Sequence, residues 1–270
     1  MAYNTAYDLE SLMVNTKAAT VYTAQENSLF LGGSLIPAVN LPAGSIVAQV
    51  PVMGSVTAEK ITSADPDALD DFSAQLVTDT KVTIEANIYA ARQVLRDLGG
   101  IDANETGRVL GNSVSAAFDA DCIAAMNGLT ASTADSDPVT MDALFDAVAQ
   151  IRGAGEMGGL VGILSPAEAA NLMKAVGTAA YAGGDFQTEG LRNGFIGKIA
   201  GISMFQSAYV SGVNKGFIFG QDALRVAMFK NVDVEVQRRA AAVGNDIIAN
   251  LHAGVGVVDA TRGVKLINVA

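Results

Sequence analysis

The sequence predicts an α+β protein in which strands, helices and further strands follow one another without a regular strand–helix alternation. Three observations lead to this prediction. Strand-like runs occupy the first third of the chain, amphipathic helices follow, and short strand-like runs fill most of the last third. The chain has 270 residues and is 50% hydrophobic, which is enough apolar material for one large domain or two smaller ones.

The composition favours extensive protein contact over a membrane or a nucleic-acid-binding surface. Mean hydropathy is +0.32, but no apolar run approaches the roughly 18 residues of a membrane-spanning helix, and no signal peptide is predicted. Charged residues make up only 17% of the chain, below the roughly 25% typical of soluble domains. The net charge of −11 argues against a protein that grips phosphates, although an acidic inner wall is compatible with enclosing DNA.

The first third of the chain predicts an arm and then a hairpin with a charged excursion. Residues 1–35 are polar and mixed, so we expect an arm with little core of its own. Residues 45–52 and 80–88 are strand-like runs, and the apolar side chains of the second run share one face. Between them, residues 54–73 are charged and poor in apolar side chains. Because an isolated hairpin is barely stable in water, we expect it to lie on a neighbouring subunit.

Three helices and a buried strand are predicted in the middle of the chain. Residues 104–128 carry apolar side chains at helical spacing and end at a glycine. A polar loop at residues 130–138 precedes a second helix at residues 141–151. The apolar residues 160–164 predict a buried strand, and residues 165–176 begin with Ser-Pro-Ala-Glu, a pattern typical of a helix start.

The remainder of the chain is predicted to be mostly strands. Residues 177–194 are rich in glycine and polar side chains, which predicts a mobile loop. One more helix is expected at residues 240–250, and a final pair of strands is expected near residues 254–259 and 263–269. The other strand-like runs lie at residues 195–205, 216–220, 225–229 and 232–238.

Few residues in the sequence point to catalysis or cofactor binding. Cys122 is the sole cysteine and His252 the sole histidine, which excludes a disulfide within the chain, a thiolate zinc site and a histidine pair. We interpret Cys122 as a small buried side chain and His252 as structural, because no GxSxG nucleophile turn accompanies it. Gly153–Gly158 has the GxGxxG pattern of dinucleotide-binding turns, but it follows a predicted helix and precedes a predicted strand. This order is the reverse of what such a site needs, so we interpret it as a flexible turn.

Carboxylates are plentiful, so the sequence leaves a catalytic carboxylate pair open. The closest groupings are Asp70–Asp71 and Asp119 with Asp121. Side chains at these spacings do not share a helix face, and we interpret both groupings as solvated or intersubunit charge. No catalytic residue, metal ligand or cofactor is predicted.

Three stretches, taken in order, match features of one known family, and the first of them includes the long helix. Residues 45–90 form the charged excursion between strands, which ends in Leu76–Ile84, and the long helix at residues 104–128 follows. Residues 159–166 have the sequence Gly-Leu-Val-Gly-Ile-Leu-Ser-Pro, and residues 194–207 begin Gly-Phe-Ile-Gly-Lys-Ile-Ala-Gly-Ile. In this order the stretches resemble the major capsid protein of tailed bacteriophages, with the Hong Kong 97-type capsid fold.

The resemblance implies an α+β capsid fold with an N-terminal arm, an extended E-loop, a P-domain with a long spine helix, and an A-domain. Residues 223–227 and 255–260 fit the C-terminal strands of the family. The implied parts are the arm and the turn after it at residues 1–44, the E-loop hairpin and flanking P-domain strands at 45–90, the P-domain with the spine helix at 91–138, the A-domain with the loop 177–194 at 139–222, and the return strands at 223–270.

The resemblance also implies a function. The chain would be a structural subunit and not an enzyme, and it would assemble with copies of itself into the hexamers and pentamers of an icosahedral phage head that encloses double-stranded DNA. The arm and the E-loop would lie across neighbouring subunits. We expect charged loop residues to meet basic residues of a neighbour; the residues concerned are Glu59, Lys60, Asp70 and Asp71 in the loop, and Arg238 and Arg239 on the neighbour.

Further partners follow from the same resemblance. About 35 residues precede the first strand, which is too few for a fused scaffolding segment, so a separate scaffolding protein is expected. A portal is expected as well, with a decoration protein as an optional partner, and neither a cofactor nor a membrane is expected. Assembly would take place in the host cytoplasm, and the product would be the capsid of the virion.

Three other functions stay open at this stage. The first is an encapsulin-like nanocompartment shell, which houses cargo enzymes and no genome. The second is a soluble enzyme with a carboxylate-based site, which would form monomers or small oligomers and turn over a substrate. The third is a tail or surface-layer protein, which would form tubes or sheets in place of closed shells.

Overall fold

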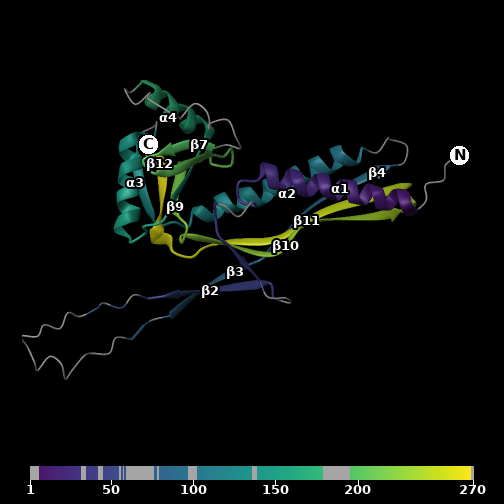
Figure 1. Ribbon diagram of the computed structural model, residues 1–270, viewed down its shortest axis with the longest axis horizontal. Helices are drawn as coiled ribbons and strands as arrows, with labels where there is room; N and C mark the ends of the chain where they lie inside the picture. The colour runs from purple at the N-terminus through teal and green to yellow at the C-terminus, as the bar shows by residue number, and fades with distance from the viewer. Residues whose placement is uncertain are drawn as a thin grey trace, which may run out of the picture.

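Two larger sheets carry the fold, and the longest strands of the four-stranded one run through much of the elongated molecule (Figure 1). The hairpin formed by β2 (Val47–Met53) and β3 (Asp79–Glu85) projects from the body of the molecule (Figure 1). The computed structural model describes residues 6–31, 35–41, 45–54, 56, 58, 76–77, 79–96, 102–135, 139–178 and 195–268.

The first sheet has the strand order β1-β10-β11-β4. Its strands are β1 (Ala38–Asn40), β10 (Leu224–Arg239), β11 (Gly244–Val257) and β4 (Asn87–Arg96). β1 pairs parallel to β10, and the other neighbours are antiparallel. Every second residue of β11 from Ile247 to Ala253 is fully buried, which is the alternation of a strand with one face on the core.

Two helices cover one face of this sheet (Figure 1). They are α1 (Ala6–Asn27) and α2 (Ala103–Met126), and α2 confirms the predicted long helix. The Asp102 side chain accepts hydrogen bonds from two backbone N–H groups of the first turn, which caps α2 at its N-terminus. The apolar stripe of α2 enters the main core, as predicted for Cys122, and its buried members are Leu110, Val114, Phe118, Cys122, Ile123 and Met126.

The contact between α1 and α2 is a close approach of two backbones. A Cβ atom added at Gly107 would lie 2.7 Å from the carbonyl oxygen of Thr16, and one added at Gly111 would lie 2.6 Å from that of Thr20. Thr16 and Thr20 are fully buried. The expectation of an arm with little core of its own is therefore wrong for α1. The helix could not be predicted from the sequence because its packing face is made of threonine and alanine and not of large apolar side chains.

We expect Gly111→Ala to destabilise the protein by about 1–3 kcal/mol, because its methyl group would push α1 away from α2. Urea unfolding and hydrogen exchange of α1 would measure the change. Gly153→Ala is the matched control: no atom lies within 4 Å of its added Cβ, and it should be neutral or stabilising by about 0.4–1 kcal/mol. Equal stability of the two variants would contradict this account of the α1–α2 contact.

The second sheet has the strand order β5-β12-β9-β6-β8-β7. All five residues of its central strand β6 are buried. One face packs against α3 and α4, and the other faces the main core below α2. The elements are β5 (Ala131–Asp135), α3 (Met141–Gly153), β6 (Leu160–Leu164), α4 (Pro166–Thr178), β7 (Phe195–Ile199), β8 (Ile202–Gln206), β9 (Asn214–Gly220) and β12 (Gly263–Asn268).

The predicted hairpin is confirmed. β2 (Val47–Met53) and β3 (Asp79–Glu85) pair antiparallel along their whole length. At its base, Ala48 and Ile84 form a small buried cluster with Ala227 of β10. The predicted single strand at residues 80–88 is wrong, because the pairing ends at Glu85 and β4 begins a new sheet. The side chain of Ile88 is consequently 68% exposed and does not share a face with Ile84.

Some further predictions for the second half are wrong. The helix expected at residues 240–250 is a short 3-10 turn at Ala240–Ala242 followed by β11. Three alanines favour a helix locally, but pairing on both sides with β10 and β4 decides the conformation. Strand β5 lies within the loop expected at residues 130–138. The runs 225–229 and 232–238 form one strand, and residues 254–257 belong to β11 and not to a pair with β12.

Candidate functional site

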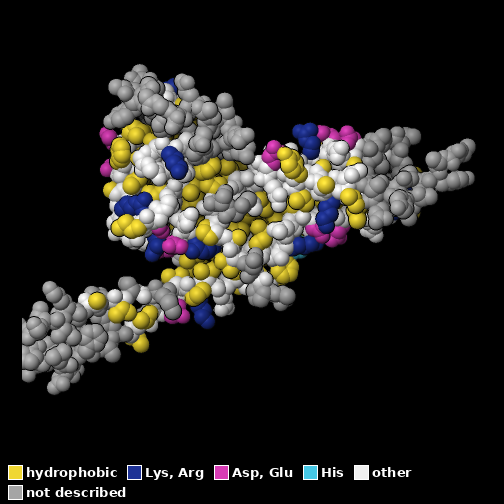
Figure 2. Space-filling model, viewed as in Figure 1, with side chains coloured by type: hydrophobic (Ala, Val, Ile, Leu, Met, Phe, Trp, Pro, Cys, Tyr) yellow, Lys and Arg dark blue, Asp and Glu magenta, His cyan; other side chains and the backbone are white. Residues whose placement is uncertain are grey.

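The candidate functional surfaces are those that the chain itself leaves uncovered. The hairpin of β2 and β3 is the clearest case, because it extends into solvent beyond its small basal cluster (Figure 1). Figure 2 shows hydrophobic side chains where the hairpin leaves the body and along it. The side chains of Ile46, Val56 and Leu76 are 72%, 53% and 95% exposed. Exposed apolar side chains gathered on a projecting element are typical of a surface that contacts another protein.

The structure places two of the six predicted contact residues. Arg238 and Arg239 are the last residues of β10, and both are exposed. They lie at the end of the body farthest from the hairpin (Figure 1). The other four residues lie outside the residues that the structure describes: Glu59, Lys60, Asp70 and Asp71. Most of the predicted mobile loop, residues 179–194, lies outside them as well.

Arg238 and Arg239, at the end of β10, lie near a carboxylate that is paired with another arginine. Asp246 of β11 accepts hydrogen bonds from the guanidinium of Arg92 on β4, at 2.7 and 2.9 Å from Nε. The Arg92 guanidinium lowers the pKa of Asp246 below its ordinary value. Arg238 approaches Asn245 at 3.5 Å. Arg92, Arg238 and Arg239 thus bring their guanidinium groups to this end of the sheet, near the carboxylate of Asp246.

Asp119 is held inside the chain, so its interpretation as solvated or intersubunit charge is wrong. It is 4% exposed and accepts hydrogen bonds from the Ser28 hydroxyl at 2.6 Å and from the Leu29 N–H at 3.0 Å. Burial raises the pKa of Asp119, and these hydrogen bonds partly offset the rise. Asp121 accepts a hydrogen bond from the Tyr89 hydroxyl at 2.8 Å. Asp119, which lies on α2, therefore holds the turn that follows α1 against α2.

A second electrostatic contact attaches α1 to the sheet. Lys17 of α1 lies 2.5 Å from the carboxylate of Asp233 on β10, and Lys230 lies 2.9 Å from the same carboxylate. The hydrogen bonds from Lys17 and Lys230 lower the pKa of Asp233 to about 2. A carboxyl group whose pKa is lowered by folding stabilises the folded state at pH values above the ordinary carboxyl pKa. This stability is lost as the pH falls toward the folded-state pKa.

We therefore expect the unfolding midpoint in urea to fall as the pH is lowered from about 4 to about 2, partly through Asp233. Asp233→Asn should lower the midpoint at pH 7 and show a smaller further loss over that interval. Asp146→Asn, an exposed carboxylate on α3, is the control and should keep the wild-type profile. The same pH profile for Asp233→Asn and wild type would contradict the assignment.

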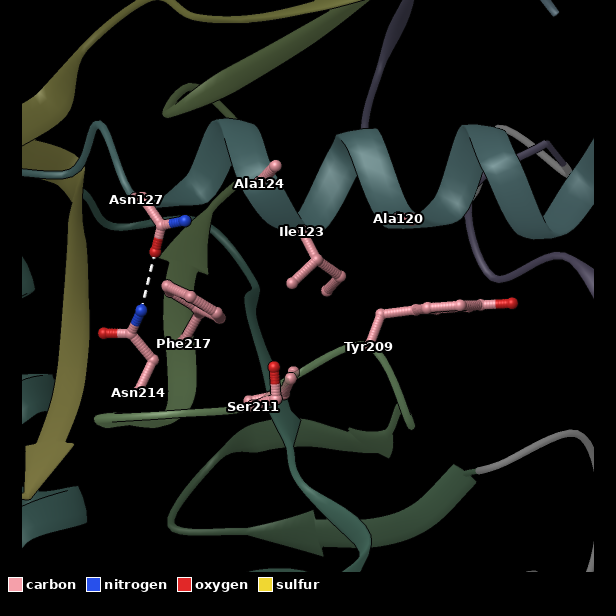
Figure 3. Close-up of a pocket in the computed structure, with 9 residues that line it drawn as sticks. Ala120, Ile123, Ala124, Asn127, Tyr209, Ser211, Asn214 and Phe217 are labelled. Carbon is pink, nitrogen blue, oxygen red and sulfur yellow. Dashed lines mark hydrogen bonds between the residues drawn. The ribbon is translucent and has the colours of Figure 1, made fainter.

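A small pocket lies between the end of α2 and the loop before β9 (Figure 3). Its volume is about 200 Å³, less than the roughly 300 Å³ at which small-molecule sites begin. Asn214 donates a hydrogen bond to Asn127 across its rim at 2.7 Å, and none of its lining side chains is charged. Within the described residues, no three His, Cys, Asp or Glu side chains form a group that could hold a metal ion.

The GxGxxG turn and His252, the other two features noted in the sequence, make contacts within the fold. Gly153–Gly158 begins at the last residue of α3 and leads to β6, which confirms the reversed order predicted for it. The Arg152 guanidinium closes this turn by donating to the carbonyl groups of Glu156 and Gly158. His252 is half-buried on β11 and stacks on Phe229, with ring centroids 5.9 Å apart. In the described part of the chain, no helix has the length and apolar character needed to cross a membrane.

Comparison with models of protein families gave no match, and comparison with curated protein sequences gave none either. Comparison with solved structures, by contrast, gave many matches, and those to phage capsids and to a virus-like particle extend over most of the chain. These matches define the class of fold, which is the fold of phage capsid structures.

Three solved structures illustrate the likeness. The capsid of Ralstonia phage GP4 matches with a TM-score of 0.67 and 11% identity, over 90% of this chain and 92% of the other. The capsid of cyanophage P-SCSP1u matches with a TM-score of 0.65 and 13% identity, over 87% and 86%. A virus-like particle from Pyrococcus furiosus matches with a TM-score of 0.63 and 14% identity, over 94% and 98%. The chain therefore has an α+β capsid fold, as predicted.

Proposed function

We propose that this chain is the major capsid protein of a tailed bacteriophage. It is a structural subunit and not an enzyme, and its copies assemble into the hexamers and pentamers of an icosahedral head around double-stranded DNA. The observation that carries the proposal is a capsid fold that spans about nine-tenths of both this chain and several phage capsid proteins.

The exposed elements support assembly into a shell. A two-stranded hairpin is marginally stable in water on its own, and this one carries exposed apolar side chains away from the body. A neighbouring subunit that receives the hairpin would cover those side chains and extend the interface beyond the size of a standard protein contact. The low charge of the chain, 17%, fits a surface that is largely covered by other subunits.

We assign the described elements to the parts implied by the resemblance. The hairpin of β2 and β3 takes the place of the E-loop, and α2 with the four-stranded sheet takes the place of the P-domain and its spine helix. The six-stranded sheet with α3 and α4 takes the place of the A-domain. Within the arm at residues 1–44, α1 would act as part of the P-domain, because it packs on α2 of its own chain.

The charged contact is proposed between subunits and not within one. The hairpin and the end of β10 point to opposite ends of the molecule (Figure 1), which favours a contact between two copies over a contact within one chain. Loop carboxylates would be attracted to the arginines at the end of β10, and Lys60 would pair with an acidic group there. The proposed contact residues are Glu59, Lys60, Asp70 and Asp71 on one subunit, and Arg238 and Arg239 on its neighbour.

The triple variant Lys60→Ala, Asp70→Ala and Asp71→Ala should assemble poorly, because it removes charged groups of the loop contact. Sedimentation would measure the assembled fraction, and circular dichroism would show that the free subunit keeps its fold. The matched control, Asp142→Ala, Asp146→Ala and Lys198→Ala, removes the same set of charges from exposed positions elsewhere and should assemble like wild type. A triple loop variant that forms shells in normal yield would refute the loop contact.

The proposal includes further partners and a location. A separate scaffolding protein would guide assembly in the host cytoplasm, a portal would occupy one vertex, and a decoration protein is an optional addition to the finished virion. DNA would be enclosed without sequence-specific binding. The net charge of −11 supports this view, because an acidic wall repels packed phosphates.

A second candidate is the shell of an encapsulin-like nanocompartment. The virus-like particle from Pyrococcus furiosus favours it, because that chain is covered over 98% of its length. The contents of native particles separate the two functions. Purified particles should contain DNA that resists nuclease until the shell is opened, if the chain forms a phage head. Particles filled with a cargo protein and free of DNA would instead establish the nanocompartment.

A further inference from the structure

The two sheets are joined by only a few short connections in the described part of the chain. The backbone passes between them at residues 127–130, from α2 to β5, at residues 221–223, from β9 to β10, and at residues 258–262, from β11 to β12. The angle between the sheets therefore depends on how these three short segments are held relative to one another, together with the apolar core that the two parts share below α2.

Backbone hydrogen bonds tie the three connections together. The N–H and hydroxyl groups of Thr130 both donate to the carbonyl of Ala260, each at 3.2 Å. The Val258 N–H donates to the carbonyl of Ala223 at 2.8 Å. The third connection thus contacts both of the others, and the junction behaves as one folded unit.

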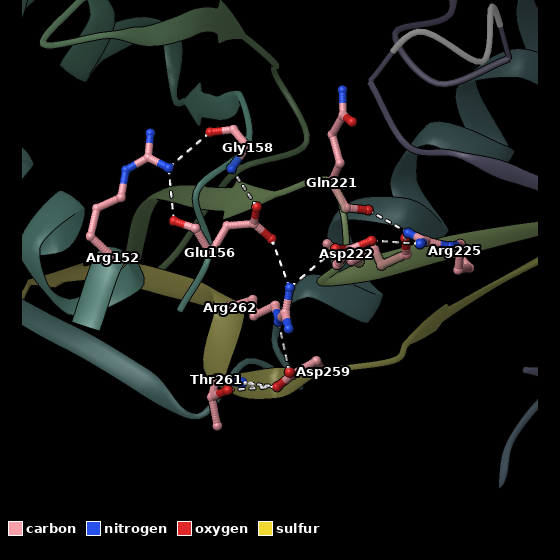
Figure 4. Close-up of polar contacts among 10 residues, drawn as sticks. Arg152, Glu156, Gly158, Gln221, Asp222, Arg225, Asp259, Thr261 and Arg262 are labelled. Carbon is pink, nitrogen blue, oxygen red and sulfur yellow. Dashed lines mark hydrogen bonds and ion pairs between the residues drawn. The ribbon is translucent and has the colours of Figure 1, made fainter. Parts of the chain in front are cut away.

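Arg262 adds ion pairs to this junction (Figure 4). Its Nη1 lies 3.3 Å from the carboxylate of Glu156 and 3.1 Å from that of Asp222, while its Nε donates to Asp259 at 3.0 Å. These carboxylates come from the turn between α3 and β6, from the second connection and from the third. One planar guanidinium, with its fixed fork of donors, therefore joins three separate segments.

Glu156, the partner of Arg262, is buried and held in place beside the six-stranded sheet. Its side chain is 5% exposed, and its other carboxylate oxygen accepts the N–H of Gly158 at 2.8 Å. A Cβ atom at Gly220 would lie 2.4 Å from its Cγ, so only a glycine leaves space for it there. A carboxylate buried in this way is strongly unfavourable without its cation, which keeps Arg262 at the junction.

We infer that Arg262, seated on Glu156, is a positioning residue that fixes the angle between the two sheets and thereby the diameter of the shell. The inference rests on the proposed function for its second half. In a closed shell each sheet would contact different neighbours, so a change of angle within the subunit alters the rotation between subunits. That rotation decides how many copies close the assembly.

The angle can be measured on free subunits. Spin labels on Ser113→Cys in α2 and Asp146→Cys in α3 would report the distance between the two parts, since both positions are exposed and Cys122 is buried. In this background, Glu156→Gln with Arg262→Gln removes both charges and leaves neither one buried alone. We expect a broader and shifted distance distribution for this pair of substitutions. A distribution equal to that of the parent would overturn the positioning role.

The matched control is Glu105→Gln with Arg108→Gln, which removes an exposed ion pair of 3.4 Å from α2 and should leave the distribution unchanged. Arg262→Lys keeps the charge but not the guanidinium fork, so it should broaden the distribution even if the double variant does not fold. Parent-like distances in Arg262→Lys together with an unfolded double variant would also overturn the inference.

Electron microscopy of assembled shells tests the second half. The control should form shells of wild-type diameter, and the Glu156→Gln and Arg262→Gln variant should form shells with a shifted or wider range of diameters. Variant shells of wild-type diameter would overturn the link between the angle and shell size. If wild type forms no shells, the proposed function fails, while the spin-label distances still decide the role of Arg262 in the subunit.

Discussion

The long antiparallel pair of β10 and β11 is the constraint on which the rest of the structure depends. The two strands contain 16 and 14 residues, so at about 3.3 Å per residue each spans roughly 45–50 Å. The apolar face of so long a ribbon needs equally long elements to bury it. The helices α1 and α2 supply that cover on one face, and the hairpin lies against part of the other face near its base. The elongated shape follows, and with it the surfaces left for neighbouring copies.

Elements with a strong local pattern could be predicted from the sequence. The apolar stripe of α2 recurs at helical spacing, and the continuous apolar run of β6 has the character of a strand buried on both faces. The hairpin was predictable because a charged, apolar-poor segment separates two strand-like runs. The order of these elements led to the capsid fold, which the solved phage capsids confirm.

Features that depend on distant contacts could not be predicted. The packing face of α1 consists of small side chains opposite glycines of α2, and β11 follows three alanines that favour a helix locally. Asp119 meets Ser28 across 91 positions of the sequence, and Glu156 meets Arg262 across 106. No local pattern marks such pairs, because each partner alone resembles an ordinary surface charge or polar residue.

The most direct measurement of the central claim is negative-stain electron microscopy of the recombinant chain, expressed alone and together with candidate scaffolding proteins. We expect closed particles of uniform size, or capsomer rings that close into particles when the scaffolding protein is present. Tubes or flat sheets would contradict a closed shell. A persistent monomer under both conditions would contradict self-assembly altogether and would favour a soluble protein with a different function.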